Sequence, residues 1–227
     1  MNSEKITIKE LAGMMDHTNL QPYATENDFI KLCREAKENS FAMVAINPAP
    51  VKLCKELLLG SGVHVGAAIS FPLGQTTIAE KADETEKSIE DGADEIDYVI
   101  QIGMLKMGRL DYIREEMETI VSICRKHQVL SKVIFENCYL TAEEIRAAAT
   151  IAKEVKPDFI KTSTGFGTYG ARVEDVRLMK EIVGDIVKVK AAGGIRDWEI
   201  CAAMIDAGAE RIGTSRSIDI CEQFSRR

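Results

Sequence analysis

Eight short apolar segments, each followed by a stretch of helical periodicity, limit the fold of this chain more than any other feature. The segments are apolar along their length, as parallel strands covered on both faces should be. No linker or low-complexity tract interrupts the alternation. We expect strands at residues 14–18, 42–46, 63–69, 95–100, 131–136, 158–161, 186–190 and 211–213, and helices at about 8–13, from 25, 51–58, 78–91, 108–128, 141–155, 173–183, 197–207 and from 217.

A faint internal repeat supports a closed arrangement of these units. Residues 89–96 (IEDGADEI) match residues 205–212 (IDAGAERI), and in both a helix ends at a glycine before a strand begins. We therefore predict an α/β fold, a single (β/α)8 TIM barrel with a short N-terminal helix and residues 1–227 as one domain. A doubly wound open sheet is the alternative, but eight units and no early G-x-G-x-x-G pattern favour closure.

Charge and cysteine content narrow the class of protein. The formal net charge of −7 disfavours a nucleic-acid-binding protein but is compatible with small anionic substrates. The six cysteines form no C-x-x-C pair, so they predict neither a zinc site nor a redox motif. No apolar run approaches the ~20 residues of a membrane span, and the polar first residues do not resemble a signal peptide. We expect a cytoplasmic protein with no membrane or nucleic-acid partner.

Two strands end in lysine, which is unusual for buried segments. Lys161 is followed by a loop rich in glycine and hydroxyl groups, and Lys190 is followed by Ala-Ala-Gly-Gly. Two lysines in one pocket raise each other's cost of protonation, so one should be a free amine near neutral pH. The alternative is a structural ion pair of Lys161 with Glu136 or Asp97, but the second lysine favours a chemical role.

Other polar residues also fall at or near the C-terminal ends of predicted strands, where barrel enzymes carry their catalytic groups. Asp97 lies within an apolar strand and must pair with a lysine or act as an acid or base. Asp16 has the same two interpretations. Lys188 should point inward, one layer deeper than Lys190, and pair with an acid of a neighbouring strand. His17 is expected to be a hydrogen-bonded scaffold residue.

Two glycine-containing turns could supply an anion site. Residues 192–196 (AGGIR) and 212–216 (IGTSR) follow the seventh and eighth predicted strands. The loops after these strands often bind phosphate in such barrels, because their backbone N–H groups point at the ligand. We therefore expect a phosphate subsite there.

Short pieces spread in order over nearly the whole chain match one known family. They are DHT at 16–18, FPLG at 71–74, EID at 95–97, IG at 102–103 with LK at 105–106, KVIFE at 132–136, KTSTGFG at 161–167, KAAGGIR at 190–196 and RIGTS at 211–215. On these motifs, of which the lysine motif at 161–167 is highly specific, the chain resembles the deoxyribose-phosphate aldolases, class I lyases that act through a Schiff base.

The resemblance implies a reaction and a role for each site residue. Lys161 would form an imine with acetaldehyde or 2-deoxyribose 5-phosphate, Lys190 would depress its pKa, and Asp97 would shuttle protons through a water. The products would be acetaldehyde and glyceraldehyde 3-phosphate, with no metal or other cofactor, and analogy with similar barrels suggests a homodimer. Asp16 would hold Lys190. The residues expected to bind substrate are Asp16, Thr18, Thr164, Gly165, Gly193, Gly194, Arg196, Gly213, Thr214 and Ser215.

Some positions depart from the family pattern and leave alternatives open. Those that differ are Ala45, Ser70, Gln101, Thr168, Tyr169, Arg172, Arg216 and Ser217. Arg172 and Arg216 fall near the expected phosphate end, where Arg216 would either strengthen binding of the substrate phosphate or crowd it out. A Schiff-base aldolase acting on another or unphosphorylated aldehyde is one alternative. A non-catalytic sugar-phosphate-binding barrel is the other, although it would be expected to lose a lysine or Asp97.

Overall fold

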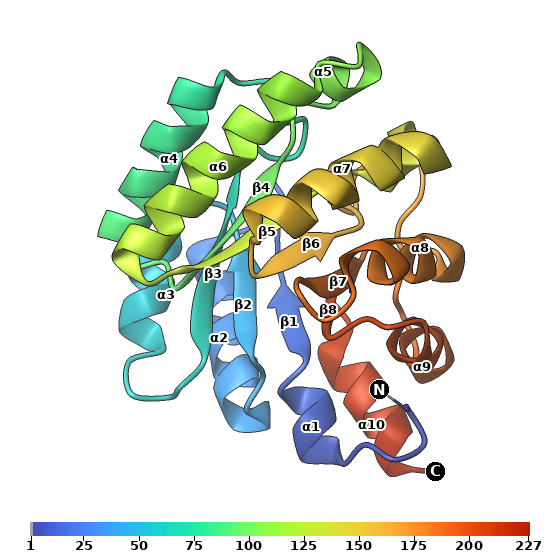
Figure 1. Ribbon diagram of the computed structural model, residues 1–227. Helices are drawn as coiled ribbons and strands as arrows, with labels where there is room; N and C mark the ends of the chain where they lie inside the picture. The colour runs from blue at the N-terminus through green and yellow to red at the C-terminus, as the bar shows by residue number, and fades with distance from the viewer. Residues whose placement is uncertain (1) are drawn as a thin grey trace.

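The computed structural model describes residues 2–227 and contains all eight expected strands. They pair in parallel in chain order, and β8 closes onto β1, so the helices wrap a complete barrel (Figure 1). The predicted (β/α)8 barrel is confirmed. The strands are β1 (Met15–Thr18), β2 (Met43–Ile46), β3 (His64–Ile69), β4 (Glu95–Val99), β5 (Leu130–Ile134), β6 (Phe159–Lys161), β7 (Lys188–Ala192) and β8 (Arg211–Thr214). The helices are α1 (Ile8–Ala12), α2 (Glu26–Asn39), α3 (Val51–Leu57), α4 (Ile78–Glu90), α5 (Ile102–Lys106), α6 (Leu110–His127), η1 (Asn137–Tyr139), α7 (Ala142–Val155), α8 (Val173–Val183), α9 (Trp198–Asp206) and α10 (Ser217–Ser225).

The strands separate an apolar layer from a polar interior. Outward-facing residues such as Val44 and Val133 belong to one hydrophobic core between the sheet and the helices. The alternate residues face into the barrel, and many of them are charged yet buried. Buried charge of this kind requires partners, so the interior must be a connected ionic network. Its buried members on the strands are Asp16, Glu95, Asp97, Lys132, Lys161 and Lys190.

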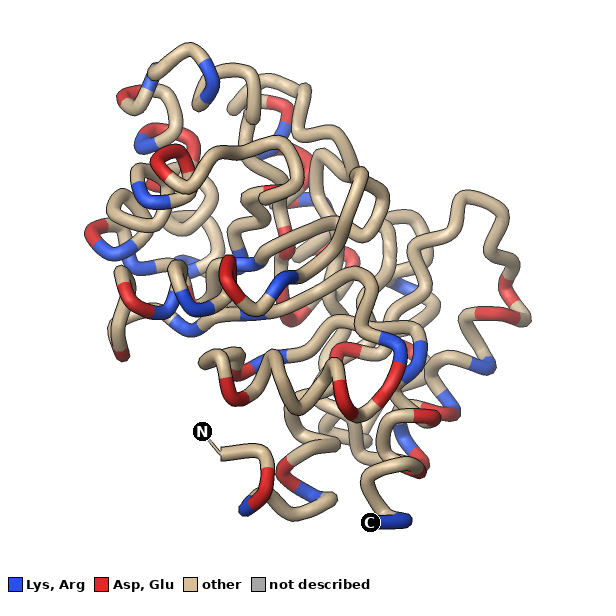
Figure 2. Tube along the Cα trace, turned by 90° about the vertical axis from the view of Figure 1, so that its right-hand side faces the viewer, with Lys and Arg blue, Asp and Glu red and all other residues tan. Residues whose placement is uncertain are grey.

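Several outer helices begin with the same local device. Thr7, Thr77 and Thr141 each accept a hydrogen bond from the backbone N–H three residues later, and a glutamate there bonds back to the threonine N–H. Figure 2 shows acidic and basic positions interspersed along the outer helices. Within residues 2–227 no helix combines the length and apolarity that crossing a bilayer would need.

The internal repeat has a structural basis. Gly92 and Gly208 follow α4 and α9 with φ of 107° and 112°, values that a side chain rarely tolerates. A Cβ on either glycine would lie 2.7 Å from the Cγ of a lysine, Lys55 or Lys180, that crosses over it. Each lysine then pairs with an acid two residues after the glycine, at 2.6 Å and 2.9 Å. The repeated motif therefore ties the starts of β4 and β8 to α3 and α8, the helices that carry the two lysines.

One short helix and one strand boundary differ from the predicted ones. The predicted helix at 108–128 is α6, and an additional short helix, α5, precedes it; Gly108, with φ 71°, lies between the two. The fifth strand ends at Ile134 rather than at 136. Glu136 adopts φ 55°, which no strand accommodates, and the short helix η1 follows it.

The predicted ion pair of Lys188 is wrong. Lys188 begins β7 on the inward parity, but it is exposed and contacts no carboxylate within the described part of the chain. Its ammonium lies 5.5 Å from the ring centroid of Phe159 instead. Because this end of the strand reaches solvent, water rather than an acid satisfies the charge.

Candidate active site

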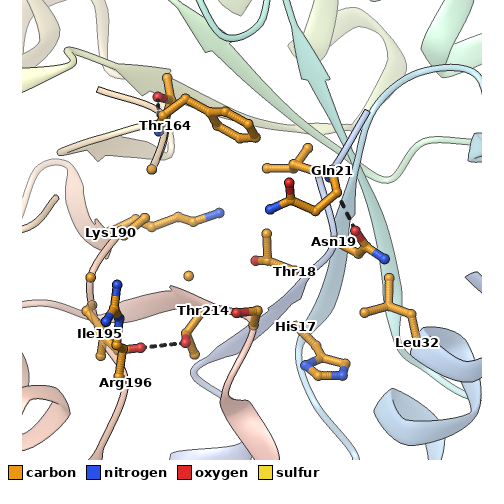
Figure 3. Close-up of a pocket in the computed structure, with 18 of the residues that line it drawn as sticks. His17, Thr18, Asn19, Gln21, Leu32, Thr164, Lys190, Ile195, Arg196 and Thr214 are labelled. Atoms are coloured by element: carbon orange, nitrogen blue, oxygen red, sulfur yellow. Dashed lines mark hydrogen bonds between the residues drawn. The ribbon is translucent and has the colours of Figure 1, made fainter. Parts of the chain in front are cut away.

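The C-terminal ends of the strands enclose a cavity of about 540 Å³. Lys161 and Lys190 both line it, and the loops after β1, β6, β7 and β8 contribute to its walls. Figure 3 shows Lys190 pointing into the cavity. This is the end of the barrel at which catalytic groups are found. The predicted site residues that line it are Thr18, Lys161, Thr164, Gly165, Lys190, Gly193, Gly194, Arg196, Gly213, Thr214 and Ser215.

Lys161 combines burial with access to the cavity. Its side chain is 3% exposed, and Nζ lies 2.9 Å from Oδ2 of Asp97. Burial, with a smaller contribution from the ammonium groups of Lys190 and Lys132, lowers the pKa of Lys161 to about 8 even though Asp97 acts in the opposite direction. A substantial fraction of Lys161 is therefore an uncharged amine near neutral pH, as the sequence argument predicted, although burial contributes more than Lys190.

Asp97 holds three lysines together. Its Oδ1 lies 2.6 Å from Nζ of Lys132, and its Oδ2 accepts hydrogen bonds from Lys161 at 2.9 Å and Lys190 at 2.7 Å. Burial alone would raise the pKa of Asp97, but the surrounding ammonium groups hold it well below its usual range. Asp97 is therefore a carboxylate at neutral pH, positioned between the two predicted catalytic lysines.

Lys132 is a member of the site that the sequence reasoning did not single out. It pairs with Asp97 across adjacent strands and also lies 2.5 Å from Glu95. Burial would lower the pKa of Lys132, but Asp97 and Glu95 together raise it, so this lysine is an ammonium ion. A signal was present, because Lys132 is a lysine near the start of the apolar strand predicted at 131–136.

Asp16 lies beneath the cavity and does not line it. It is fully buried; Oδ2 lies 2.5 Å from Nζ of Lys190, without the angle of a hydrogen bond, and Oδ1 accepts one from Arg211 at 2.7 Å. The structure thus places Asp16 to hold Lys190, while its other expected role, contact with substrate, has no surface through which to occur. Arg211 also reaches Glu95, at 3.3 Å.

The charges of the ion-paired network cancel when Lys161 and the partly exposed His64, whose Nδ1 lies 2.8 Å from Oε1 of Glu95, are both neutral. Besides these two, its cations are Lys132, Lys190 and Arg211, and its anions are Asp16, Glu95 and Asp97. Three charges of each sign then cancel, and a protonated Lys161 would add one uncompensated positive charge in a buried environment. Uncompensated buried charge is costly, so this count agrees with the lowered pKa of Lys161.

Small residues on the opposite strands leave room for the long lysines. Ala45, Gly66 and Ala68 are the inward residues of β2 and β3 nearest this layer. A side chain at Gly66 would collide with Met43, whose sulfur lies 3.4 Å from Nζ of Lys132. The interior is therefore filled from one side by lysines and from the other by compact residues.

The predicted anion end of the cavity has the expected backbone. Gly193 and Gly194 adopt φ of 83° and 75°, which turns their backbone sharply after β7. Thr214 donates a hydrogen bond to the carbonyl of Ile195 at 2.6 Å, which ties the loops after β7 and β8 together (Figure 3). Arg196 is exposed at this rim, and no carboxylate pairs with it among the described residues. It is a free cation at the mouth of the cavity.

Comparison with known proteins assigns the chain to a family. A family model described as DeoC/LacD family aldolase matches residues 11–221. The chain belongs to the DeoC/LacD aldolase family. A curated protein from Lactobacillus acidophilus named deoxyribose-phosphate aldolase is 56% identical over 223 residues, which cover 98% of this chain and 94% of that protein. The predicted resemblance is confirmed.

Solved structures agree with this family. One from Coccidioides immitis, titled a putative deoxyribose-phosphate aldolase, has a TM-score of 0.93 and 34% identity and covers 98% of this chain and 88% of that one. One from Aeropyrum pernix, titled a unique tetrameric deoxyribose phosphate aldolase, has a TM-score of 0.90 and 30% identity and covers 96% and 92%. Both therefore extend over nearly the whole of this chain.

In this DeoC/LacD aldolase, the two arginines expected near the phosphate end lie outside the cavity. Arg172 stacks on the ring of Tyr169, with its guanidinium carbon 3.5 Å from the ring centroid. Arg216 is exposed and pairs with Asp219 at 3.1 Å. Neither lines the cavity, so neither crowds the rim at which Arg196 is placed.

Proposed function

We propose that this protein reversibly cleaves 2-deoxy-D-ribose 5-phosphate to acetaldehyde and D-glyceraldehyde 3-phosphate through an imine on Lys161. The observation that carries the proposal is the environment of Lys161. Its amine is buried at the base of an open cavity, has a pKa lowered to about 8, and hydrogen-bonds the carboxylate that also holds Lys190. The family and the names of its relatives support the same reaction.

The chemistry follows from a neutral amine beside a carboxylate. The Lys161 amine adds to the C1 aldehyde, and loss of water from the carbinolamine gives an iminium ion. Removal of the proton from the C3 hydroxyl breaks the C2–C3 bond, and the electron pair moves into the iminium to give an enamine. The three-carbon fragment, C3 to C5 of the substrate, leaves as glyceraldehyde 3-phosphate. Protonation and hydrolysis of the enamine then release acetaldehyde from Lys161.

Asp97 is placed to move protons in these steps. Its Oδ2 lies 2.9 Å from the reacting nitrogen of Lys161, and its low pKa keeps the carboxylate deprotonated between proton transfers. We propose that a water between Asp97 and the substrate carries protons to and from the carbinolamine and enamine. Lys190 acts as the neighbouring cation that disfavours protonation of Lys161, and Asp16 keeps Lys190 in place.

The cavity walls suggest where the rest of the substrate lies. Thr18 and Thr164 line the cavity above the lysines and are placed to meet the substrate hydroxyls. The turns at Gly193 and Thr214, with Arg196 at the rim, are proposed to seat the phosphate. A substrate held at both ends would present its C1 aldehyde to Lys161.

Two assays test the proposal directly. Purified protein should release acetaldehyde from 2-deoxyribose 5-phosphate much faster than from 2-deoxyribose, as followed by proton NMR of quenched samples. Borohydride reduction in the presence of acetaldehyde should add a two-carbon group at Lys161, which peptide mass spectrometry would locate. A protein that cleaves neither sugar, or an adduct found only on other lysines, would refute the assignment.

We also propose that residues 1–227 act as one domain in a cytoplasmic self-associating enzyme. The barrel uses strands from both ends of the chain, and the six cysteines are free, which suits a reducing compartment. We expect a homodimer, and the Aeropyrum pernix relative, whose title describes a tetramer, makes the tetramer the outcome to distinguish. Light scattering during size-exclusion chromatography would separate these masses.

A further inference from the structure

Glu136 occupies an unusual position directly after β5. Its side chain is buried, with the residue 1% exposed, and its backbone adopts φ 55°, a region that few residues other than glycine enter. Such a conformation persists only where surrounding contacts hold it, and it often occurs at functional sites. At this position the carboxylate contacts the loop that follows Lys161.

The carboxylate of Glu136 fixes that loop through Thr164. The backbone N–H of Thr164 lies 3.2 and 3.3 Å from the two carboxylate oxygens, and the Thr164 hydroxyl donates a hydrogen bond to Oε2. The same hydroxyl oxygen accepts a hydrogen bond from the N–H of Phe166 at 3.0 Å. One buried acid therefore orders three consecutive residues.

The loop wraps closely around this acid. A Cβ on Gly167 would collide with the sulfur of Cys138 and lie 3.2 Å from Cδ of Glu136. Glycine is therefore required for the approach, and the loop depends on the position of the Glu136 carboxyl group. Both oxygens of the carboxyl group accept hydrogen bonds from this loop, so they can define its position.

The loop after Lys161 has a cavity on each side, which increases its dependence on the contacts with Glu136. Thr164 and Phe166 line the catalytic cavity and also line a second cavity of about 470 Å³, whose wall includes Glu136. The loop thus separates the two cavities, and the contacts with Glu136 help to fix its position between them. Figure 3 shows Thr164 at the edge of the catalytic cavity, across from Thr18.

We propose that Glu136 is a positioning residue for the substrate, which keeps Thr164 where it can meet a substrate hydroxyl without contacting the substrate itself. This inference rests on the proposed function, because it names how one wall of that site is held. It predicts that loss of the carboxyl group weakens substrate binding and leaves the amine chemistry of Lys161 intact.

The test compares three variants of Glu136 with a matched control. Glu136→Ala removes the acceptor, Glu136→Asp keeps the charge but shortens its reach, and Glu136→Gln keeps the reach with neutral hydrogen-bonding groups. Glu144→Ala is the control, because Glu144 accepts a hydrogen bond from the N–H of Thr141 outside both cavities. KM and kcat for 2-deoxyribose 5-phosphate and the rate of borohydride trapping with acetaldehyde are measured for each.

We expect the Ala and Asp variants to raise KM about tenfold, while Gln stays within about threefold of the wild type. Acetaldehyde trapping at Lys161 and the kinetics of Glu144→Ala should match the wild type. Adding Glu136→Ala to Thr164→Ala should cause no loss beyond that of Thr164→Ala alone, because both act through one contact. A wild-type KM in Glu136→Ala, additive losses in the double variant, or a Gln variant as impaired as Ala would overturn the proposal.

A measurement without substrate separates this inference from the proposed function. Hydrogen exchange of residues 162–168 should be faster in Glu136→Asp than in the wild type, and unchanged in Glu136→Gln. If the wild type fails to cleave the sugar phosphate, the reaction assignment is lost, but the exchange result still decides whether Glu136 holds the loop. If Glu136→Ala does not fold, the Asp and Gln variants carry the comparison.

Discussion

Replacing Lys190 by methionine removes a positive charge beside Lys161 while nearly keeping the length of the side chain. Both Nζ atoms contact the same oxygen of Asp97, at 2.9 and 2.7 Å, so they lie no more than about 5.6 Å apart. At an effective dielectric constant of about 20, two unit charges at this distance interact by about 3 kcal/mol, which is about 2 pKa units. The pKa of Lys161, lowered to about 8 by burial and by its neighbours, should therefore rise to about 10.

The shift has a measurable consequence for catalysis. At about pH 7.5, a pKa of about 8 leaves roughly a quarter of Lys161 as the free amine, and a pKa of about 10 leaves about 0.3%. We expect kcat/KM for 2-deoxyribose 5-phosphate to fall by roughly 80-fold at this pH and its ascending limb to move up by about 2 pH units. The measurement is kcat/KM between about pH 6 and about pH 10.5, over which the limb should be resolved.

Lys188→Met provides the matched control, because Lys188 lies two residues earlier on the same strand and is exposed. It removes the same charge without touching Asp97, so its pH profile should match the wild type. If Lys190→Met keeps the wild-type limb, the argument that Lys190 tunes Lys161 is refuted. If turnover is too low to measure, the pH dependence of acetaldehyde trapping at Lys161 gives the same pKa.

Three further predictions concern the rim, the interior and the unfolded state. Arg196→Ala should raise KM for the phosphorylated sugar by about tenfold. Arg216→Ala should leave KM unchanged, because Arg216 lies outside the cavity. Equal effects of the two substitutions would contradict the assigned phosphate end. Gly213→Ala would place a Cβ 2.9 Å from Cβ of Ala192 and 3.1 Å from Cε of Lys190. Its kcat should therefore fall while the protein stays folded by circular dichroism, and an unchanged kcat would show that β7 and Lys190 can shift without loss of function. The pKa of Lys161 is lowered on folding, so between about pH 8 and about pH 10.4 the unfolded chain binds one proton more than the folded chain. The free energy of unfolding of the wild type should therefore rise by about 3 kcal/mol across this window relative to that of Lys161→Met, as measured by urea unfolding. A difference that stays constant with pH would exclude the pKa shift.

The order of strands and helices could be predicted because it depends on local pattern. Short apolar segments ending in glycine or proline signals mark buried strands, and the repeat at Gly92 and Gly208 marks the same helix-to-strand turn twice. The short helix α5 was missed because a segment of five residues is too short to show helical periodicity. The left-handed conformation of Glu136 was missed because it arises from contacts with a loop distant in sequence.

The candidate site was only partly predictable. Lys161 and Lys190 stood out because each ends an apolar strand and precedes a polar loop, and they converge because β6 pairs with β7 in a register that sets them side by side. Lys132 could not be ranked from sequence, because its role depends on its register opposite Asp97. Lys188 was misjudged because strand parity gives direction but not depth, and depth decides whether water or a carboxylate satisfies a charge.

The balance of charges within the barrel bears on the direction of electron flow in the proposed reaction. An iminium ion on Lys161 would be a fourth cation among three carboxylates, so the network that suits the free amine does not suit this intermediate. Cleavage of the carbon–carbon bond removes that excess charge, because the released electron pair turns the iminium into a neutral enamine. The ion pairs that stabilise the resting barrel would thus also favour the step that breaks the carbon–carbon bond.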